Sequence, residues 1–456
     1  MSNKQRNGTI ESGILGLCVA DALGVPVEFE SRRKLRQNPV TDMRGYGTYN
    51  QPPGTWSDDT SMALCLLDSL ANGLDYRDIA DKFLSWLNNA DYTPHGSVFD
   101  VGIVTSEAIH RYRQGGEPLK CGGASDRDNG NGSLMRILPL AFYLDALYGK
   151  DFIEDAEAVE IIHNVSSLTH AHKRSQIACS IYLSIANAIV NGDELDKAFE
   201  FSIYNVKKLY EQKKDFSHEL KHYMRVFDYN SFKNLPEDSI DSSGYVVYTL
   251  EAALWCLLNT SNYESCVLKA VNLGGDTDTV AAIAGGLAGL LYGRDSIPAK
   301  WLEQIARLDY IKGLCTAFEE ALRKMSARKL TSFIPYFENL SPDTAVKWDG
   351  GGKRDDGTIY LSYPVYDSKF MKFIDSFYHS SIVDYDYKNT LEKHYGDGEG
   401  INMHEIVKTA DINQLKAILT ECVRVERFCD GAWANYIKSD LFLDILRRLK
   451  NLTESN

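Results

Sequence analysis

The chain has 456 residues, enough for one large domain and a smaller one. Hydrophobic residues make up 44% and charged residues 25% of it, an ordinary globular composition that excludes wholesale disorder. Because 63 Asp and Glu outnumber 49 Lys and Arg, the net charge is −14, and so acidic a surface repels nucleic-acid phosphates and anionic lipid. We therefore expect no nucleic-acid or membrane partner, while a local basic pocket for one small anion remains compatible with this charge.

Cysteine usage and the N-terminus indicate a protein of the reducing cytoplasm. The nine cysteines are odd in number, form no CxxC pair and lie mostly in apolar runs, which predicts buried, reduced thiols. Residues 1–13 lack the apolar segment of a signal peptide. The longest apolar run, Val280–Tyr292, is shorter than the roughly 20 residues that span a bilayer, and it predicts a packed core helix.

From residue 12 to about residue 328 the sequence has the apolar spacing of helices. Apolar residues recur at intervals of three and four, and the strict alternation typical of strands is scarce. Turn-forming residues gather between these segments. The sequence therefore predicts an all-α domain over residues 8–330, with helices that include Ser61–Leu70, Asp78–Leu87, Gln176–Val190, Val247–Leu258 and Val280–Leu291.

A second, smaller module is expected over residues 358–456. The polar stretch Ser341–Gly357 is predicted to be an accessible linker, so that a cut just before it leaves a folded first domain. Beyond it, Thr358–Tyr366 alternates loosely, as in a short strand or extended segment, and Asn402–Leu449 returns to helical spacing. The aromatic residues of Phe370–Tyr387 are expected to pack on something, because exposed they would form a sticky patch. The module is predicted to be α+β or mostly α.

Two acidic clusters each precede an apolar helical segment. The first is Ser57-Asp58-Asp59-Thr60, and the second is Gly274-Gly275-Asp276-Thr277-Asp278-Thr279. Helix capping is the plain interpretation, since Ser, Asp and Thr accept hydrogen bonds from free backbone N–H groups. A cap needs only one side chain, however, and adjacent carboxylates resist ionising together unless a cation compensates them. Such oxygen ligands suit Mg²⁺, Mn²⁺ or Ca²⁺ rather than Zn²⁺, and two such helix starts that met in space could hold a pair of metal ions.

Two further segments contain residue types found in binding sites. Glycines in Gly122–Ser133 would let backbone N–H groups close around an anion at a helix start, although a flexible connection is the commoner role of such a loop. His170 and His172 precede another helical segment. Histidines two positions apart do not share a helix face, so capping or substrate contact is favoured over metal binding.

Taken in order, these segments resemble the ADP-ribosylglycohydrolase family, which includes the dinitrogenase reductase-activating glycohydrolases. The resemblance covers residues from about 10 to 325 and does not extend to 340–456. Each motif alone is weak, but all of them in this order form a highly specific signal. The motifs are Gly16–Gly24 with Pro26–Phe29, Trp56–Thr60, Phe99–Gly102, Gly130–Arg136, Thr169-His170 and Gly274–Thr279.

The resemblance implies an orthogonally packed helical fold with a centre of two Mg²⁺ or Mn²⁺ ions at the bottom of a cleft. The metal ligands that it implies are Ser57, Asp58, Asp59, Asp276, Asp278 and Thr279. Glu28 occupies the place of an acidic residue near the metals and the scissile bond, so the implied catalytic residues are Glu28, Asp58 and Asp59. The implied substrate contacts are Asp100 and Gly102 near the distal ribose, Asn131, Gly132, Ser133, Met135 and Arg136 at the ADP-ribose phosphates, and His170.

The activity implied is that of a metal-dependent hydrolase that releases ADP-ribose from an ADP-ribosylated protein or a small ADP-ribosyl substrate. The favoured bond is the N-glycosidic link to arginine, where a carboxylate (Glu28 or a metal-bound Asp) moves the proton and Asp100 pairs with the departing guanidinium. Two alternatives stay open: another linkage, to serine or in O-acetyl-ADP-ribose, and a protein that binds ADP-ribose without turnover. The C-terminal stretch Glu426–Trp433 with Leu441–Leu449 resembles a small uncharacterised bacterial domain, and a packing or interaction module is the favoured interpretation.

Overall fold

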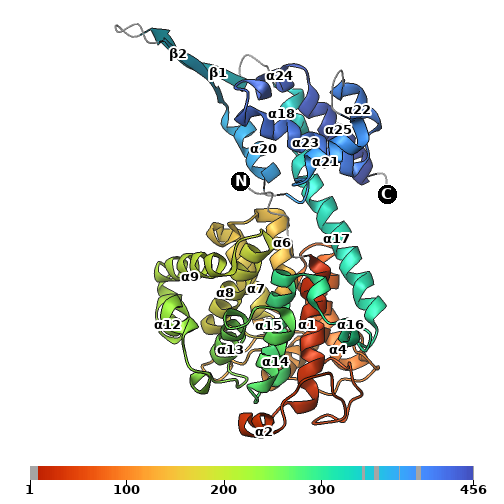
Figure 1. Ribbon diagram of the computed structural model, residues 1–456, viewed down its shortest axis with the longest axis vertical. Helices are drawn as coiled ribbons and strands as arrows, with labels where there is room; N and C mark the ends of the chain where they lie inside the picture. The colour runs from red at the N-terminus through yellow and green to blue at the C-terminus, as the bar shows by residue number, and fades with distance from the viewer. Residues whose placement is uncertain (1–8, 341–344, 354–358, 379, 397–401, 455–456) are drawn as a thin grey trace. The chain divides into compact units, whose positions relative to one another are not determined.

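The fold is all-α, as the sequence predicts, and the chain divides into two compact units (Figure 1). The larger unit spans residues 6–320 and the smaller one residues 321–456. Among the described residues, strands occur only in one two-stranded sheet of the smaller unit. The computed structural model describes residues 9–340, 345–353, 359–378, 380–396 and 402–454.

Helices joined by short loops build the larger unit. The five segments for which the sequence predicts helices lie within α3, α4, α8, α13 and α15, so these predictions are confirmed. Its α-helices are α1 (Ile10–Gly24), α2 (Arg32–Gln37), α3 (Asp58–Leu70), α4 (Tyr76–Asn89), α5 (Ile103–Arg113), α6 (Leu138–Tyr148), α7 (Ala156–Ser167), α8 (Lys173–Val190), α9 (Leu195–Glu211), α10 (Lys214–Ser217), α11 (Met224–Phe227), α12 (Tyr229–Lys233), α13 (Val246–Leu258), α14 (Tyr263–Asn272), α15 (Thr277–Tyr292), α16 (Ala299–Leu302) and the start of α17 (Leu308–Thr331). Its 3-10 helices are η1 (Val25–Val27), η2 (Pro118–Lys120), η3 (Phe152–Glu154), η4 (Leu220–Tyr223), η5 (Glu237–Ser239) and η6 (Arg294–Ser296).

Helices α1 and α15 pack side by side and antiparallel in the interior of the larger unit (Figure 1). Their backbones approach closely because the facing residues are small. A Cβ atom on Gly16 would lie 2.4 Å from the Gly285 carbonyl oxygen. At the other end of the contact, a Cβ atom on Gly24 would lie 2.3 Å from the Asp278 Cα atom. The packing therefore presses the end of α1 against the start of α15, which is where the second acidic cluster lies.

The stretch Ile10–Val27 is long and apolar enough to cross a membrane by length and composition, with a mean hydropathy of 1.6. In the structure 94% of it is buried inside the protein. Every residue of α1 except Glu11 is buried. The helix therefore has the surroundings of a core helix, and a core helix passes the same test of length and composition.

The smaller unit combines a helical cluster with one antiparallel ribbon. Strands β1 (Val346–Lys353) and β2 (Ile359–Tyr366) pair with Val346 opposite Tyr366 and extend away from the helices of this unit (Figure 1). Strand β2 confirms the expected strand at Thr358–Tyr366, and β1 lies inside the stretch expected to be a linker, of which residues 341–344 and 354–357 lie outside the described residues. The helices are the end of α17, α18 (Ile334–Glu338), α20 (Ser368–Tyr378), α21 (Tyr387–Tyr395), α22 (Met403–Thr409), α23 (Ile412–Arg424), η7 (Val425–Arg427), α24 (Ala432–Lys438) and α25 (Leu441–Glu454).

The expected aromatic cluster packs in the core of the smaller unit itself. The Phe337 ring of α18 lies 6.2 Å from Phe370 and 5.1 Å from Phe373, measured between ring centroids. It also lies 5.9 Å from Phe442 of α25. Leu330, near the end of α17, is buried in the same core. The boundary between the units therefore falls inside α17, on the N-terminal side of the expected boundary at residue 330, because the last turns of this helix complete the core of the C-terminal unit.

We expect a fragment of residues 1–320 to aggregate less than a fragment of residues 1–340. The longer fragment keeps Leu330, Ile334 and Phe337 but loses the aromatic core that buries them, and exposed apolar patches of this kind promote aggregation. Gel filtration with light scattering should show the shorter fragment as a single species and the longer one as partly aggregated. Equal behaviour of the two fragments would contradict this boundary.

Candidate active site

The first acidic cluster forms the start of α3. Ser57 is the N-cap residue, and its side chain accepts a hydrogen bond from the Asp59 backbone N–H. Asp58 and Asp59 follow in the first turn, where the positive end of the helix favours carboxylates. Both are buried, as is the N-cap serine. The capping interpretation therefore holds for Ser57 and leaves the two carboxylates free for another role.

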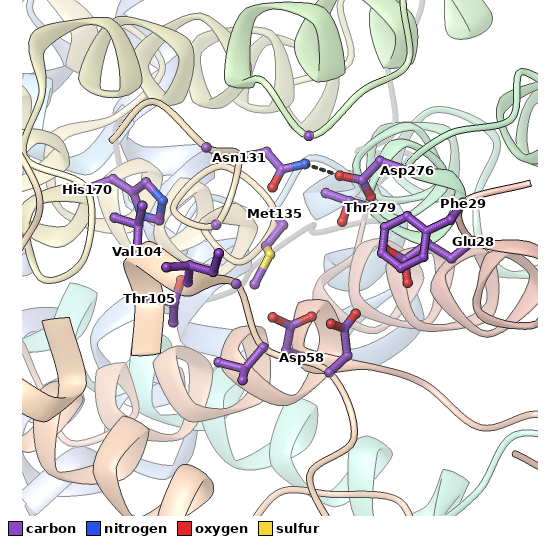
Figure 2. Close-up of a pocket in the computed structure, with 17 residues that line it drawn as sticks. Glu28, Phe29, Asp58, Val104, Thr105, Asn131, Met135, His170, Asp276 and Thr279 are labelled. Atoms are coloured by element: carbon purple, nitrogen blue, oxygen red, sulfur yellow. Dashed lines mark hydrogen bonds between the residues drawn. The ribbon is translucent and has the colours of Figure 1, made fainter. Parts of the chain in front are cut away.

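The second acidic cluster forms the turn before α15. Gly274 and Gly275 have φ values of +75° and +77°, a region that favours glycine, and they direct the chain into the helix. Asp276 is the N-cap residue but makes no side-chain cap hydrogen bond. Its carboxylate instead accepts a hydrogen bond of 2.8 Å from the Asn131 side-chain amide (Figure 2). Capping therefore does not explain Asp276, whose side chain is directed into the site.

The two clusters meet where α1, α3 and α15 come together. The Thr279 hydroxyl donates a hydrogen bond of 3.2 Å to Asp59. One carboxylate oxygen from each of Asp21, Asp59 and Asp278 lies within 4.8 Å of the other two. A second group with the same spacing contains Glu28, Asp100 and Asp278. Asp278 belongs to both groups, so the carboxylates form one continuous cluster.

Several carboxylate oxygens of this cluster are buried without a hydrogen-bond partner. They are Glu28 Oε2, Asp59 Oδ1, Asp276 Oδ1 and Asp278 Oδ2. No described Lys, Arg or His makes an ion pair with these residues. By contrast, the buried Glu219 elsewhere in the same unit receives a hydrogen bond of 2.7 Å from the Arg174 guanidinium. Unpaired, buried carboxylate oxygens that lie close together are a donor set that fits a hard divalent cation.

Burial and mutual repulsion raise the pKa values of the whole cluster. Burial, together with the negative charge of Asp100, raises the pKa of Glu28 to about 8. Burial raises the pKa of Asp100 to about 6, and burial followed by repulsion from neighbouring carboxylates raises the pKa of Asp58 and Asp278 well above the usual range. Without a bound cation the cluster therefore holds protons at neutral pH, and a cation would release them.

A cavity of about 320 Å³ opens above this cluster (Figure 2). Its size suits a small-molecule ligand. The expected residues that line it are Glu28, Asp58, Asp100, Gly102, Asn131, Gly132, Met135, His170, Asp276 and Thr279. Ser57, Asp59 and Asp278 are buried and are not part of the lining, although Asp278 lies within 4.8 Å of the lining residues Glu28 and Asp100, measured between carboxylate oxygens.

Ser133 and Arg136, which the resemblance implies as substrate contacts, are not part of the cavity lining. Both are fully buried. The Arg136 guanidinium donates to the carbonyl oxygens of Gly132 and Val165, and the Ser133 hydroxyl accepts from Ser166 at 3.1 Å. These contacts hold the glycine-rich loop from behind, because the turn between Asn131 and Arg136 points the two side chains into the core.

His170 presents a neutral imidazole to the cavity. Burial, with the nearby Arg136 charge, lowers its pKa to about 3. Its Nδ1 atom lies 2.9 Å from the Thr169 hydroxyl. A Cβ atom on Gly132 would lie 2.8 Å from the imidazole Cε1 atom, so only glycine lets the loop lie against this ring. The position agrees with substrate contact, and His170 is absent from both groups of converging carboxylates.

Two residues of the site, Asp21 and Tyr49, are not predicted from the sequence. Asp21 lies in α1, and its carboxylate accepts hydrogen bonds from the Ser57 N–H at 3.0 Å and from the Thr60 N–H at 3.1 Å and hydroxyl at 2.6 Å. A lone Asp in an otherwise apolar helix was the available signal. Tyr49 lies near Glu28 and Asp100, where its side chain lowers the pKa of both carboxyls, and nothing in its sequence surroundings marks it.

The chain is similar in sequence and in fold to known proteins. The model of the ADP-ribosylglycohydrolase family matches residues 2–328, and that of a family of unknown function (DUF6508) matches residues 322–455. ADP-ribosylarginine hydrolase Tri1 of Serratia proteamaculans is 33% identical to this chain, in a match that covers 67% of this chain and 77% of the length of Tri1. The ADP-ribosyl-[dinitrogen reductase] glycohydrolase of Rhodospirillum rubrum is 32% identical over 64% of this chain and 88% of its own. A chain of a solved ADP-ribosylglycohydrolase-related protein complex is 29% identical and superposes with a TM-score of 0.57. The match covers 70% of this chain and 99% of the solved chain.

The family match covers most of the chain and includes the whole of the larger unit. The chain belongs to the ADP-ribosylglycohydrolase family and is a glycohydrolase.

The raised pKa of Glu28 predicts that the metal-free protein loses stability as the pH rises from about 4.5 to about 8. Over this range the folded state keeps a proton on Glu28 that the unfolded state has lost, so the free energy of unfolding falls with rising pH. Melting temperatures measured in chelator should therefore fall across this range, and Glu28→Gln should make the fall smaller. Glu303→Gln, at an exposed carboxyl of the same unit, is the matched control and should follow wild type. An identical fall of the melting temperature with pH in wild type and Glu28→Gln would refute the raised pKa of Glu28.

Proposed function

We propose that this member of the ADP-ribosylglycohydrolase family hydrolyses the N-glycosidic bond between ADP-ribose and an arginine of a modified protein, with two Mg²⁺ or Mn²⁺ ions. The observation that carries the proposal is the convergence of buried, unpaired carboxylate oxygens beneath one ligand-sized cavity. The arginine linkage is supported by the relative from Serratia proteamaculans, an ADP-ribosylarginine hydrolase.

Side chains from the starts of α3 and α15 would hold the metal ions. They are Ser57, Asp58, Asp59, Asp276, Asp278 and Thr279. The oxygens left without protein partners on Asp59, Asp276 and Asp278 support this assignment. Bound here, divalent cations supply electrophilic stabilisation and lower the pKa of a water molecule. Asp21 is not among the proposed ligands, because N–H and hydroxyl groups of the α3 start already occupy both of its oxygens.

Glu28 would carry the proton that the reaction moves. Hydrolysis breaks the bond between the ribose C1″ and the arginine nitrogen, forms a bond from C1″ to a water oxygen, and leaves the guanidine nitrogen in need of a proton. Glu28 is not among the proposed metal ligands, and its burial favours the protonated carboxyl, so Glu28 would donate to the departing nitrogen. The water loses its proton to a carboxylate of the Asp58–Asp59 pair, which restores the balance. Tyr49, which lies near Glu28 and lowers its pKa, would donate to the carboxylate that remains after the proton has left.

The carboxylates also suit the charges that develop in the reaction. Positive charge grows on the ribose ring as the glycosidic bond breaks, and nearby carboxylates stabilise it. Asp100 lies within 4.8 Å of Glu28, measured between carboxylate oxygens, and lines the cavity wall. It would pair with the arginine guanidinium through charge-assisted hydrogen bonds and so orient the leaving group.

The loop from Gly130 to Met135 would hold the rest of the ADP-ribose. The Asn131 backbone N–H donates to the Gly244 carbonyl at 3.1 Å, and Gly130 forms an isolated antiparallel β-bridge with Tyr245. These contacts fix the loop against the start of α13, with Gly132 and His170 facing the cavity. A rigid, glycine-lined wall of this kind lets a phosphate approach the backbone closely.

A substrate panel tests the proposed linkage. With Mg²⁺ or Mn²⁺ present, we expect free ADP-ribose to be released faster from an ADP-ribosyl-arginine peptide than from an ADP-ribosyl-serine peptide or O-acetyl-ADP-ribose, as measured by chromatography. Glu28→Gln should lower kcat on the arginine peptide by about 100-fold or more, because it keeps the side-chain shape and removes the transferable proton. Faster release from serine or O-acetyl-ADP-ribose would reassign the linkage. Tight ADP-ribose binding that chelator leaves unchanged, with no release from any substrate, would indicate a binding protein.

Thermal shifts test the metal ligands independently of the substrate. Mn²⁺ should raise the melting temperature of wild type, because the ion binds the native state preferentially. Asp58→Asn and Asp278→Asn should respond much less, and in chelator both should melt no lower than wild type, because each removes one crowded charge. Asp295→Asn is the matched control, since the Asp295 side chain is fully exposed in the same unit. Equal Mn²⁺ shifts in all four proteins would refute the metal assignment.

A further inference from the structure

A second cavity, of about 390 Å³, lies in the smaller unit between the start of α21 and the end of α23. It shares no lining residue with the active-site cavity. Its size falls in the range of small-molecule sites. Three cationic side chains and three aromatic rings line it, together with one carboxylate and one amide: Lys388, Arg424, Arg427, Tyr385, Tyr387, Phe428, Asp386 and Asn389.

The cavity is basic in a chain whose net charge is −14. No described carboxylate lies within ion-pair distance of Lys388, Arg424 or Arg427. The one acidic side chain in the lining, Asp386, accepts a hydrogen bond of 2.7 Å from the Asn389 amide. Three unpaired cations around one cavity repel one another, and a bound anion would relieve that repulsion.

The start of α21 adds a second attraction for an anion at the same place. Asp386 is the N-cap residue of this helix but makes no side-chain cap hydrogen bond. The backbone N–H groups of the first turn therefore keep their capacity to donate, and the positive end of the helix faces the cavity residues. Lys388 lies in this first turn, where the helix dipole disfavours a cation. A phosphate between this turn and the two arginines would satisfy both the N–H groups and Lys388.

The aromatic side chains hold the cations and offer a stacking surface. The Arg424 guanidinium lies 5.5 Å from the centroid of the Tyr387 ring. The Arg427 guanidinium lies 5.4 Å from the Tyr378 ring and donates to its hydroxyl at 3.2 Å. Stacked guanidinium groups lose less freedom when they bind a phosphate. Phe428 follows Arg427 directly, and its side chain is 85% exposed at the edge of the cavity, where a planar base could stack on it.

We propose that this cavity is a second, non-catalytic binding site for a nucleoside phosphate. Lys388, Arg424, Arg427 and the first turn of α21 bind the phosphate, and Phe428 stacks on the base. The ligand has two sources with the same chemistry: a free nucleotide, or an ADP-ribosyl group that is carried by a protein. The inference does not rest on the proposed hydrolysis, because all of its residues lie in the smaller unit.

Calorimetry on the full chain in the presence of chelator tests the site, with ADP as the probe. Wild type should bind ADP more tightly than it binds inorganic phosphate. Arg424→Gln should weaken ADP binding about tenfold, and Phe428→Ala about fivefold or more. Arg447→Gln is the matched control, because Arg447 is an exposed arginine of the same unit that pairs with Glu338 at 2.8 Å, away from the cavity. Its ADP affinity should equal that of wild type.

Competition with ADP-ribose separates the two sources. If ADP-ribose displaces ADP and loses the same affinity in Arg424→Gln, the site takes ADP-ribosyl groups, and if it does not displace ADP, the ligand is a free nucleotide. Release of ADP-ribose from the arginine peptide should be the same in wild type and Arg424→Gln, which keeps failure here distinct from failure at the active site. No ADP binding, equal ADP affinity in all four proteins, or phosphate binding as tight as ADP would overturn the proposal.

Discussion

The crowding of buried carboxylates at the junction of α1, α3 and α15 is the constraint on which the larger unit depends. Oxygens of Asp21, Asp59 and Asp278 lie within 4.8 Å of one another, and no described basic side chain compensates them. Such a cluster is stable only when protons or a cation neutralise it. The same crowding that suits the cluster to a cation therefore makes the stability of the fold depend on pH.

Asp21 differs from the other carboxylates of the cluster because both of its oxygens accept hydrogen bonds from the start of α3. Its oxygens are occupied by the N–H groups of Ser57 and Thr60 and by the Thr60 hydroxyl, so it fixes the start of α3 from the side of α1. Glu28, Asp59, Asp276 and Asp278, by contrast, each keep a buried oxygen without a hydrogen-bond partner. Glycine contacts between α1 and α15 bring these elements close enough for the cluster to form, since a side chain at Gly16 or Gly24 would separate the helices.

The two units place opposite charges around their cavities. In the larger unit, the cavity wall contains the carboxylates of Glu28, Asp58, Asp100 and Asp276, whose negative charge attracts cations. In the smaller unit, three cations surround a cavity with one carboxylate. The net charge of the chain describes neither site, because an interaction over a few ångströms depends on the neighbours that the fold assembles rather than on the overall sum.

The sequence by itself determined what depends on neighbours along the chain. Apolar spacing predicted the helices α3, α4, α8, α13 and α15, and the two clusters of Ser, Asp and Thr marked the helix starts that meet at the cavity. The order of the motifs identified the family.

Only the tertiary structure decided the contacts between residues that are distant in sequence. It brought Asp21 and Tyr49 to the site, turned Arg136 into the core behind the loop, and assigned the end of α17 to the C-terminal unit. Local pattern could not reveal these roles, because each depends on which side chains the packing of helices places opposite it, and the same Asp, Tyr or Arg in another environment would be an ordinary buried or surface residue.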